Sequence, residues 1–262
     1  MQWIPICSPV SFVAALVIAT IAGGAVANEL PAGNCKAPQA ASDLSHCDFS
    51  RQKLVGKNLR GVRLAGSKME STDFRRSDLA GADLRGSNAK WANFTAANLS
   101  GADLRAADLF HATFDDADLS DADLRGAYLF GANLIGAKAR RADFSGAYLK
   151  DILMEGIDLS GGSIRNCYAF RAVLSAARLV GSDLSGADLT GAALDQVDFS
   201  NATLQGTRLA GATLRHAIFN GANLDAANFA NADVWNANFD KALNASESVH
   251  EALAEPFVAR QR

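Results

Sequence analysis

Apolar residues recur along this chain with a period of five. Every fifth residue from Phe49 to Phe239 is Leu, Phe, Met, Ile, Val or Ala, which makes 39 consecutive positions without a break. An apolar stripe of this period would spread over every face of an α-helix, because five residues advance it by about 140°. In a β-strand an odd period would place successive apolar residues on opposite faces. The pattern therefore predicts a chain that turns a corner every five residues and returns each apolar residue to one axis.

The residues around these central positions repeat as well. Two residues before each one stands a small residue, mostly Ala, as at Ala102, Ala107 and Ala112. Three residues before it Gly is the commonest residue, and directly before it stands Asp or Asn more often than anything else. Gly, Asp and Asn favour turns. We therefore expect the central and small positions to face inward, and the residues directly before and after each central position to face outward.

This A-[DN]-[LF]-x-G pattern resembles the pentapeptide-repeat family, and the resemblance extends over residues 45–240. It implies an all-β fold, a right-handed quadrilateral β-helix with four pentapeptides in each coil. Residues 20 apart support four sides because they form columns of one residue type: Tyr128, Tyr148 and Tyr168; Phe74, Phe94 and Phe114; Phe199, Phe219 and Phe239. About ten coils would then form a rod on the order of 45–50 Å long.

Two segments depart from the regular pattern. Residues 151–170 carry larger or smaller residues at the small positions, and we expect a local distortion there (Ile152, Ile157 and Gly162). The tail, residues 241–262, leaves the repeat; Ser246 could cap a short helix that carries Val249 and Leu253 on one face and ends before Pro256. Such a helix would cover the open end of the last coil. A helix that pairs with a second chain, as in some dimeric family members, is the alternative and would give a homodimer.

The N-terminal segment differs from everything after it. Residues 1–27 contain no Lys, Arg, Asp or Glu, and an apolar run occupies residues 10–22. Ala25, Val26 and Ala27 give the small-x-small pattern of signal peptidase sites, so we predict a cleaved signal peptide, a mature N-terminus at Asn28, and a periplasmic or secreted protein. Because the first nine residues lack Lys and Arg, an uncleaved membrane anchor and a wrongly assigned start stay open as alternatives. The apolar run is short for a membrane span.

Export changes the interpretation of the cysteines. Cys7 would leave with the signal peptide. Cys35 lies in the lead-in, residues 28–44, and Cys47 follows shortly after it, so an oxidising compartment would permit a disulfide that ties down the start of the repeats. Two unpaired thiols are the alternative. Cys167 stands at a small position, and we expect a buried free thiol there.

Composition and motifs argue against catalysis. The formal net charge is −3 over 262 residues, which provides no single-sign field for nucleic acid or an anionic membrane. The four His are scattered and suggest no metal cluster, and no hydrolase, P-loop or dinucleotide motif is present. A smooth rod also lacks the concave pocket of most enzymes. We therefore expect a protein that is not an enzyme and has no cofactor.

Two outward columns stand out. We call the first the charge ladder; like charges one coil apart repel, and a parallel column of opposite charge relieves this, so we interpret it as a structural network, with anion or partner binding as the alternative. Its members are Asp83, Asp103, Asp123, Asp143, Arg85, Arg105, Arg125 and Arg165. We call the second the aromatic strip, with Lys90 and Lys150 on its line. It comprises Phe110, Tyr128, Phe130, Tyr148, Tyr168 and Phe170.

The aromatic strip is the preferred contact surface for a partner. Exposed Phe in a secreted protein usually has a function, and the partner would be a protein or a glycan of the cell envelope. Rings that only stiffen the sheet, and contact with a membrane, are the alternatives. The leading hypothesis is thus a non-catalytic scaffold or binding protein, and a structural rod without a ligand competes with it. A DNA mimic that acts on gyrase, the best-known function of the family, is less consistent with the weak net charge and the signal sequence.

Overall fold

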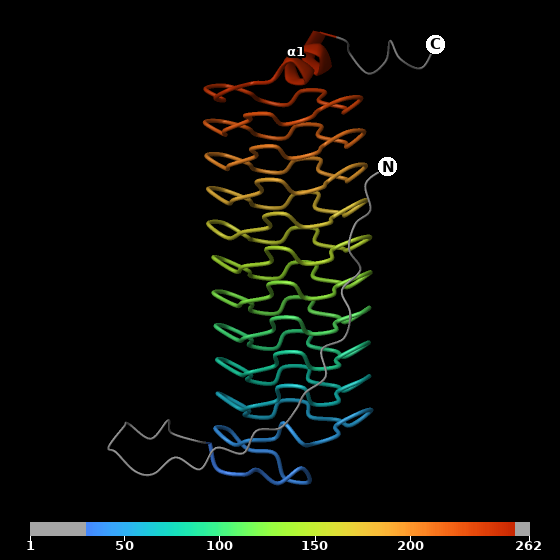
Figure 1. Ribbon diagram of the computed structural model, residues 1–262, viewed down its shortest axis with the longest axis vertical. Coiled ribbons are helices and arrows are strands. Elements are labelled where there is room, and N and C mark those ends of the chain that lie inside the picture. The colour runs from blue at the N-terminus through green and yellow to red at the C-terminus, as the bar shows by residue number, and fades with distance from the viewer. Residues whose placement is uncertain (1–29, 255–262) are drawn as a thin grey trace, which may run out of the picture.

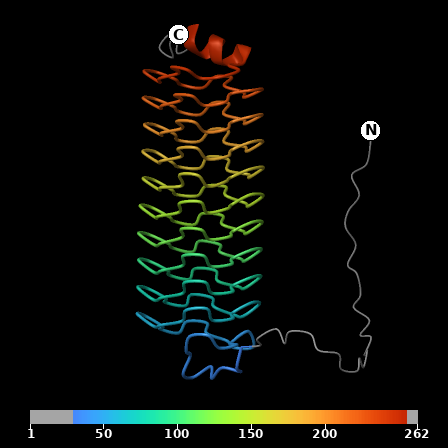
Figure 2. The same ribbon diagram turned by 90° about the vertical axis from the view of Figure 1, so that its left-hand side faces the viewer.

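The structure, a computed structural model that describes residues 30–254, is a straight rod of stacked coils (Figure 1). A view turned by 90° also shows the coils stacked directly above one another, so the rod is straight in both directions (Figure 2). Within the described residues the chain forms a single helix, α1 (Glu247–Ala254), which lies beyond the last coil. No helix among the described residues is long and apolar enough to cross a membrane.

A turn closes every five-residue repeat, and Gly101 shows why glycine is common there. The Ala102 N–H donates to the Leu99 carbonyl at 3.0 Å, and between them Gly101 has a φ of 63°. This is the positive φ that a type II turn requires at its third residue, where Gly carries no steric penalty. The same position is left-handed in other repeats without glycine, as at Ala106 with a φ of 54°.

The coils are joined by parallel bridges between residues 20 apart. Asp83 pairs with Asp103, Asp103 with Asp123, and Tyr128 with Tyr148, and this spacing continues to the pair of Asn223 and Leu243. These are isolated bridges; in residues 30–254 the chain forms no continuous strand. The sequence pattern predicts a β fold, and the structure refines this to single-residue pairings, because the next turn follows before a strand can lengthen.

The interior is filled by the central and small positions. From Leu44 to Phe229 the central residues are almost completely buried, as are most of the alanines two residues before them. Phe74, Phe94 and Phe114 stack with ring centroids 5.1 and 4.8 Å apart. Phe199, Phe219 and Phe239 repeat the arrangement at 4.9 and 4.6 Å. The inward positions are therefore those that the period of five identifies.

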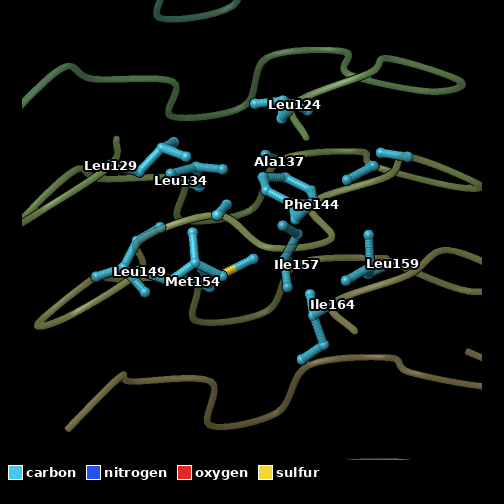
Figure 3. Packing of buried hydrophobic residues seen from close by; sticks show 14 of the residues in the cluster. Leu124, Leu129, Leu134, Ala137, Phe144, Leu149, Met154, Ile157, Leu159 and Ile164 are labelled. Atoms are coloured by element: carbon cyan, nitrogen blue, oxygen red, sulfur yellow. The ribbon is translucent and has the colours of Figure 1, made fainter. Parts of the chain in front are cut away.

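The expected distortion of residues 151–170 is wrong. Bridges run through this coil without interruption, and both Ile152 and Ile157 are buried. Figure 3 shows Ile157 among the core side chains. Ala139 and Ala169 occupy central positions that hold larger residues in most coils. Side-chain volume is thus redistributed between central and small positions while the backbone keeps its path.

The first described residues close the lower end of the rod. Ala32 pairs with Asp43, and Asp43 pairs in turn with Arg63. The Gly33 N–H donates to the Asp43 carbonyl and the Asp43 N–H to the Pro31 carbonyl, both at 2.8 Å. The predicted signal peptide, residues 1–27, and the mature N-terminus at Asn28 lie outside the described residues.

The last coil is tied to α1 by hydroxyl groups. Ser246 and Ser248 donate from Oγ to the Ala227 carbonyl at 2.6 and 3.1 Å, and the Phe229 N–H donates to Ser248 Oγ at 3.1 Å. The Ser246 hydroxyl therefore bonds to the coil and to the Ser248 hydroxyl of α1, at 2.9 Å. α1 buries Val249 as expected but not Leu253, which is 49% exposed; Ala252 is the second buried residue. Pro256 lies outside the described residues.

Candidate binding faces

The charge ladder forms three matching rungs on one face of the rod. The Arg85 guanidinium donates from Nε and Nη2 to the two carboxylate oxygens of Asp83 at 2.8 and 2.7 Å. Arg105 does the same to Asp103 at 2.9 and 2.6 Å, and Arg125 to Asp123 at 2.9 and 2.6 Å. These bidentate bonds hold the pKa of Asp83, Asp103 and Asp123 below the ordinary value.

The rungs are also linked to one another. Each arginine Nε lies 3.5–3.7 Å from a carboxylate oxygen of the next coil, so Arg85 reaches Asp103, Arg105 reaches Asp123, and Arg125 reaches Asp143. Arg165 does not belong to this network, because it pairs with Asp183 at 2.6 Å. Arg165 stands in the same column as the other three arginines, as the sequence analysis placed it, but Ser145 interrupts the row and separates Arg165 from the four aspartates.

The aromatic strip lies on the neighbouring face, which the chain enters after the next turn. Its tyrosines form one stack: Tyr128 and Tyr148 have centroids 5.0 Å apart, and Tyr148 and Tyr168 5.3 Å apart. Phe110 and Phe130 form a second stack at 5.6 Å with nearly parallel rings. Tyr128 and Tyr168 are 40% and 38% exposed, so the strip presents ring edges to solvent.

The structure extends the strip by two rings that the sequence analysis missed. Trp91 is 49% exposed and packs edge-on against Phe110 at 5.3 Å. His111 packs edge-on beside Phe110 and Phe130, with ring centroids 4.3 and 5.7 Å away, and its ring occupies space that a side chain on Gly131 would fill. Both residues stand at the corner after a central position and are 20 apart, so the column rule could have identified them.

Cations border the strip. Lys150 Nζ lies 5.6 Å from the centroid of the Phe130 ring, and the Arg171 guanidinium lies 5.5 Å from that of Phe170. Arg171 also pairs with Asp151, and Lys90 pairs with Asp108 at 3.1 Å. The strip is therefore an apolar surface bordered by cations, with the Asp108 carboxylate, which accepts the Phe110 N–H at 3.3 Å, beside its first phenylalanine.

Cys35 and Cys47 form the expected disulfide, with sulfurs 2.07 Å apart. His46 comes close to both, and in residues 30–254 these three are the one group that could hold a metal ion, with ligand atoms within 4.8 Å of one another. With the disulfide closed neither sulfur is a thiolate, so the group offers one imidazole. Cys167 is free and buried as predicted, and burial raises the pKa of its thiol to about 12. That thiol is therefore no nucleophile at neutral pH.

The solved structures that match this chain include pentapeptide repeat proteins. HetL, involved in heterocyst differentiation regulation in the cyanobacterium Nostoc sp. strain PCC 7120, is 29% identical over 77% of this chain and 89% of its own, with a TM-score of 0.49. A trypsin-treated form of QnrB1, a plasmid-mediated fluoroquinolone resistance protein, is 22% identical over 78% of this chain and 97% of its own, with a TM-score of 0.41. No curated protein matches the sequence.

The sequence profile of the family described as pentapeptide repeats matches the chain in 8 copies. The matched segments are residues 42–79, 72–109, 90–126, 107–146, 122–161, 170–206 and 207–243. Together they span residues 42–161 and 170–243, well over half of the chain. The same segments carry the 20-residue bridge spacing and the buried central positions described above. The protein therefore belongs to the pentapeptide-repeat family.

Proposed function

We propose that this protein is a non-catalytic binding protein that holds a protein partner against its aromatic strip. Proteins of this family are generally structural or binding proteins and not enzymes. The single observation that carries the proposal is the exposure of stacked rings on a flat face, with Tyr128 and Tyr168 40% and 38% exposed. A contiguous aromatic surface of this kind is costly in water and is typical of interaction sites.

The ring geometry favours a protein over a glycan. Sugar rings pack against the open face of an aromatic ring, but in the strip those faces cover one another. Tyr128 and Tyr148 are stacked at 5.0 Å with 18° between their planes, and Phe110 and Phe130 at 5.6 Å with 7°. Ring edges remain, and these suit the apolar side chains and carbonyl oxygens of a protein surface. Lys150 at the edge adds a preference for a partner carboxylate.

A DNA-mimicking function is not part of this proposal. Binding in a groove built for phosphates requires a continuous negative surface. In the charge ladder, however, Asp83, Asp103 and Asp123 each hold an arginine at 2.6–2.7 Å. The face that carries the most regular row of carboxylates is thus largely neutralised.

Capture of a partner from the cell envelope tests the proposal. Residues 28–262 are immobilised as wild type, as the strip variant Y128S/Y148S/Y168S, and as the control variant R85S/R105S/R125S on the neighbouring face. We expect wild type and the control to retain the same protein in similar amounts. The strip variant should retain at least ten-fold less of it. Purified partner is then titrated against all three chains to measure the dissociation constants.

Circular dichroism decides whether the variants keep the fold, since all six substituted side chains face outward. Equal retention by the strip variant would contradict the aromatic strip as the contact surface. Binding to a glycan array without a retained protein would replace the protein partner by a glycan. Failure to bind either would favour a structural rod without a specific ligand.

We further propose that the protein acts outside the cytoplasm, in the periplasm or as a secreted protein. The disulfide between Cys35 and Cys47 supports this, because such bonds persist in oxidising compartments. Cell fractionation with mass spectrometry of the N-terminus is the test. A chain that starts at Asn28 in the periplasmic fraction agrees with export, whereas a reduced cytosolic chain that starts at Met1 contradicts it.

The finer architectural expectations belong to the same proposal. They are a right-handed winding, about ten coils and a capping role for α1, with pairing to a second chain as the alternative for the tail. Ser246 and Ser248 support the capping role through their bonds to Ala227 and Phe229. Light scattering of residues 28–262 distinguishes a capped monomer from a homodimer.

A further inference from the structure

The charge ladder ends one arginine short. Four aspartates occupy successive coils at the same register, but only three arginines stand beside them, because position 145 is Ser. Arg165, one coil further, is already held by Asp183 at 2.6 Å. The surplus negative charge of the ladder therefore lies at its last member, Asp143.

Asp143 lacks the pair of bonds that the other three aspartates accept. In its own coil it accepts only the Ser145 N–H, at 2.8 Å, and Arg125 of the preceding coil is 3.7 Å away. Asp83, Asp103 and Asp123 each accept two short bonds from the arginine two residues later. The Asp143 side chain is accordingly 39% exposed, against 23–28% for the other three.

A hollow of about 360 Å³ opens beside Asp143. Its lining includes Ser145, Ser163 and three glycines that contribute no side chain, at positions 161, 162 and 181. Ser145 and Ser163 share a hydrogen bond at 2.8 Å. The space that an arginine fills at positions 85, 105 and 125 is thus empty at position 145 and widened by Gly161 and Gly181, whereas a side chain on Gly162 would meet Ala142 and Leu159.

The two arginines at the rim do not make this an anion site. Arg141 donates to both carboxylate oxygens of Asp121 at 2.6 Å, and Arg165 is bound to Asp183. Their charges are compensated, whereas that of Asp143 is balanced only by the long contact with Arg125. The net charge available to a ligand in the hollow is therefore negative.

We propose that this hollow receives the guanidinium group of an arginine side chain from a protein partner. The incoming group donates two parallel hydrogen bonds to the Asp143 carboxylate, as Arg85, Arg105 and Arg125 do within the chain. The incoming guanidinium then lies one coil from Arg125. Successive arginines of the charge ladder already lie one coil apart, so this separation of like charges is compatible with the fold. Because the fork of a guanidinium matches a carboxylate, arginine is preferred over lysine. This site is separate from the aromatic strip, and each can fail without the other.

Titration with N-acetyl-L-arginine amide, followed by the backbone amide signals of the ¹⁵N-labelled protein at low salt, tests the proposal. We expect saturable shifts at Ser145 and Ser163 in the millimolar range, roughly 1–50 mM at half-saturation. Amides at the filled rung of Arg105 and Asp123 should not move, which gives a control inside the same molecule. The neutral isostere N-acetyl-citrulline amide and the lysine analogue should bind at least five-fold more weakly.

Two variants identify the site. S145R places in the chain the residue that fills the same position at 85, 105 and 125, so it should melt at or above the wild-type temperature and abolish the shifts. D143N removes the charge with little change of shape and should weaken binding at least five-fold. Absence of saturable shifts, equal binding of the citrulline compound, or unchanged binding to either variant would each overturn the proposal. None of these measurements involves the tyrosines of the strip.

Discussion

The aromatic strip and the charge ladder occupy neighbouring faces of one rod and rest on the same backbone. Tyr128 donates its N–H to the Ala107 carbonyl at 3.0 Å, and Asp123 donates its own to the Ala102 carbonyl at 2.9 Å. Both residues are members of parallel bridges to residues 20 away. One face nevertheless presents rings and the other alternating charges. The comparison teaches that the backbone does not select the outward side chains, which are therefore open to selection for function.

The largest expected effect comes from removing an inward ring that both faces share. Phe114 is fully buried and stacks on Phe94 at 4.8 Å. Phe114→Ala should lower the free energy of unfolding by about 3–5 kcal/mol, because it removes apolar contacts and leaves a cavity between coils. Urea denaturation followed by circular dichroism measures the loss.

The matched control changes an outward ring, Phe110, which lies four residues before Phe114. Phe110→Ala should cost about 1 kcal/mol or less, since the ring is partly exposed and contributes mainly through stacking at 5.6 Å on Phe130. Equal losses for the two variants would mean that inward and outward positions are energetically alike, and the comparison between framework and surface would fail.

An effect smaller than that of Phe114→Ala is expected at the N-terminal end of the rod. C35S/C47S opens the bridge between residues 12 apart in sequence and should cost about 2–3 kcal/mol for a loop of this size. Because Ala32 and Asp43 pair within the tethered segment, hydrogen exchange should rise first near them and little in the middle coils. Uniformly faster exchange along both faces would show that the disulfide supports the whole rod.

The sequence predicts much of this fold because one constraint repeats. The period of five identifies the inward positions, and columns of Tyr and Phe at 20-residue intervals match the bridge spacing of the structure. Gly at the turn position corresponds to positive φ, as at Gly101. Cys35 and Cys47 form the bond expected of them. All of these predictions except the disulfide depend on local geometry that every repeat reproduces.

Other features depend on how side chains meet in space, and a period cannot reveal them. Whether Arg165 continues the ladder depends on Asp183, a competitor that lies one coil later. The isoleucines of residues 151–170 distort nothing, because volume is compensated elsewhere in the core. Trp91 reaches the strip from a corner that the pattern assigns to turns.

Asp115 contrasts with the ladder aspartates, because among the described residues no arginine or lysine forms an ion pair with its carboxylate. Its Oδ1 is buried without a hydrogen bond, and burial raises the pKa of the carboxyl above the ordinary value. A raised pKa in the folded state means that ionisation disfavours folding at pH 7 and that protonation removes the penalty. Asp115→Asn should therefore stabilise the protein by about 1 kcal/mol or less at pH 7 and have no such effect at pH 3. Thermal melts at both pH values measure the difference, and a destabilised variant at pH 7 would contradict the assignment.

The smallest effect concerns one rung of the ladder itself. Arg105→Ser should cost a few tenths to about 1 kcal/mol at pH 7, because the bond to Asp103 at 2.6 Å is partly exposed. The guanidinium lowers the pKa of Asp103 in the folded state, so the stabilisation is present above the unfolded pKa, about 3.9, and is lost as the pH falls through the folded value. Wild type and variant should therefore converge in acid melts, and also in 1 M salt. The substitution also recreates beside Asp103 the break that exists at Asp143, so N-acetyl-L-arginine amide should shift the amide of position 105 in the variant alone. A shift there would show that one missing rung suffices to admit a guanidinium, and its absence would mean that the glycines of the natural hollow are needed as well.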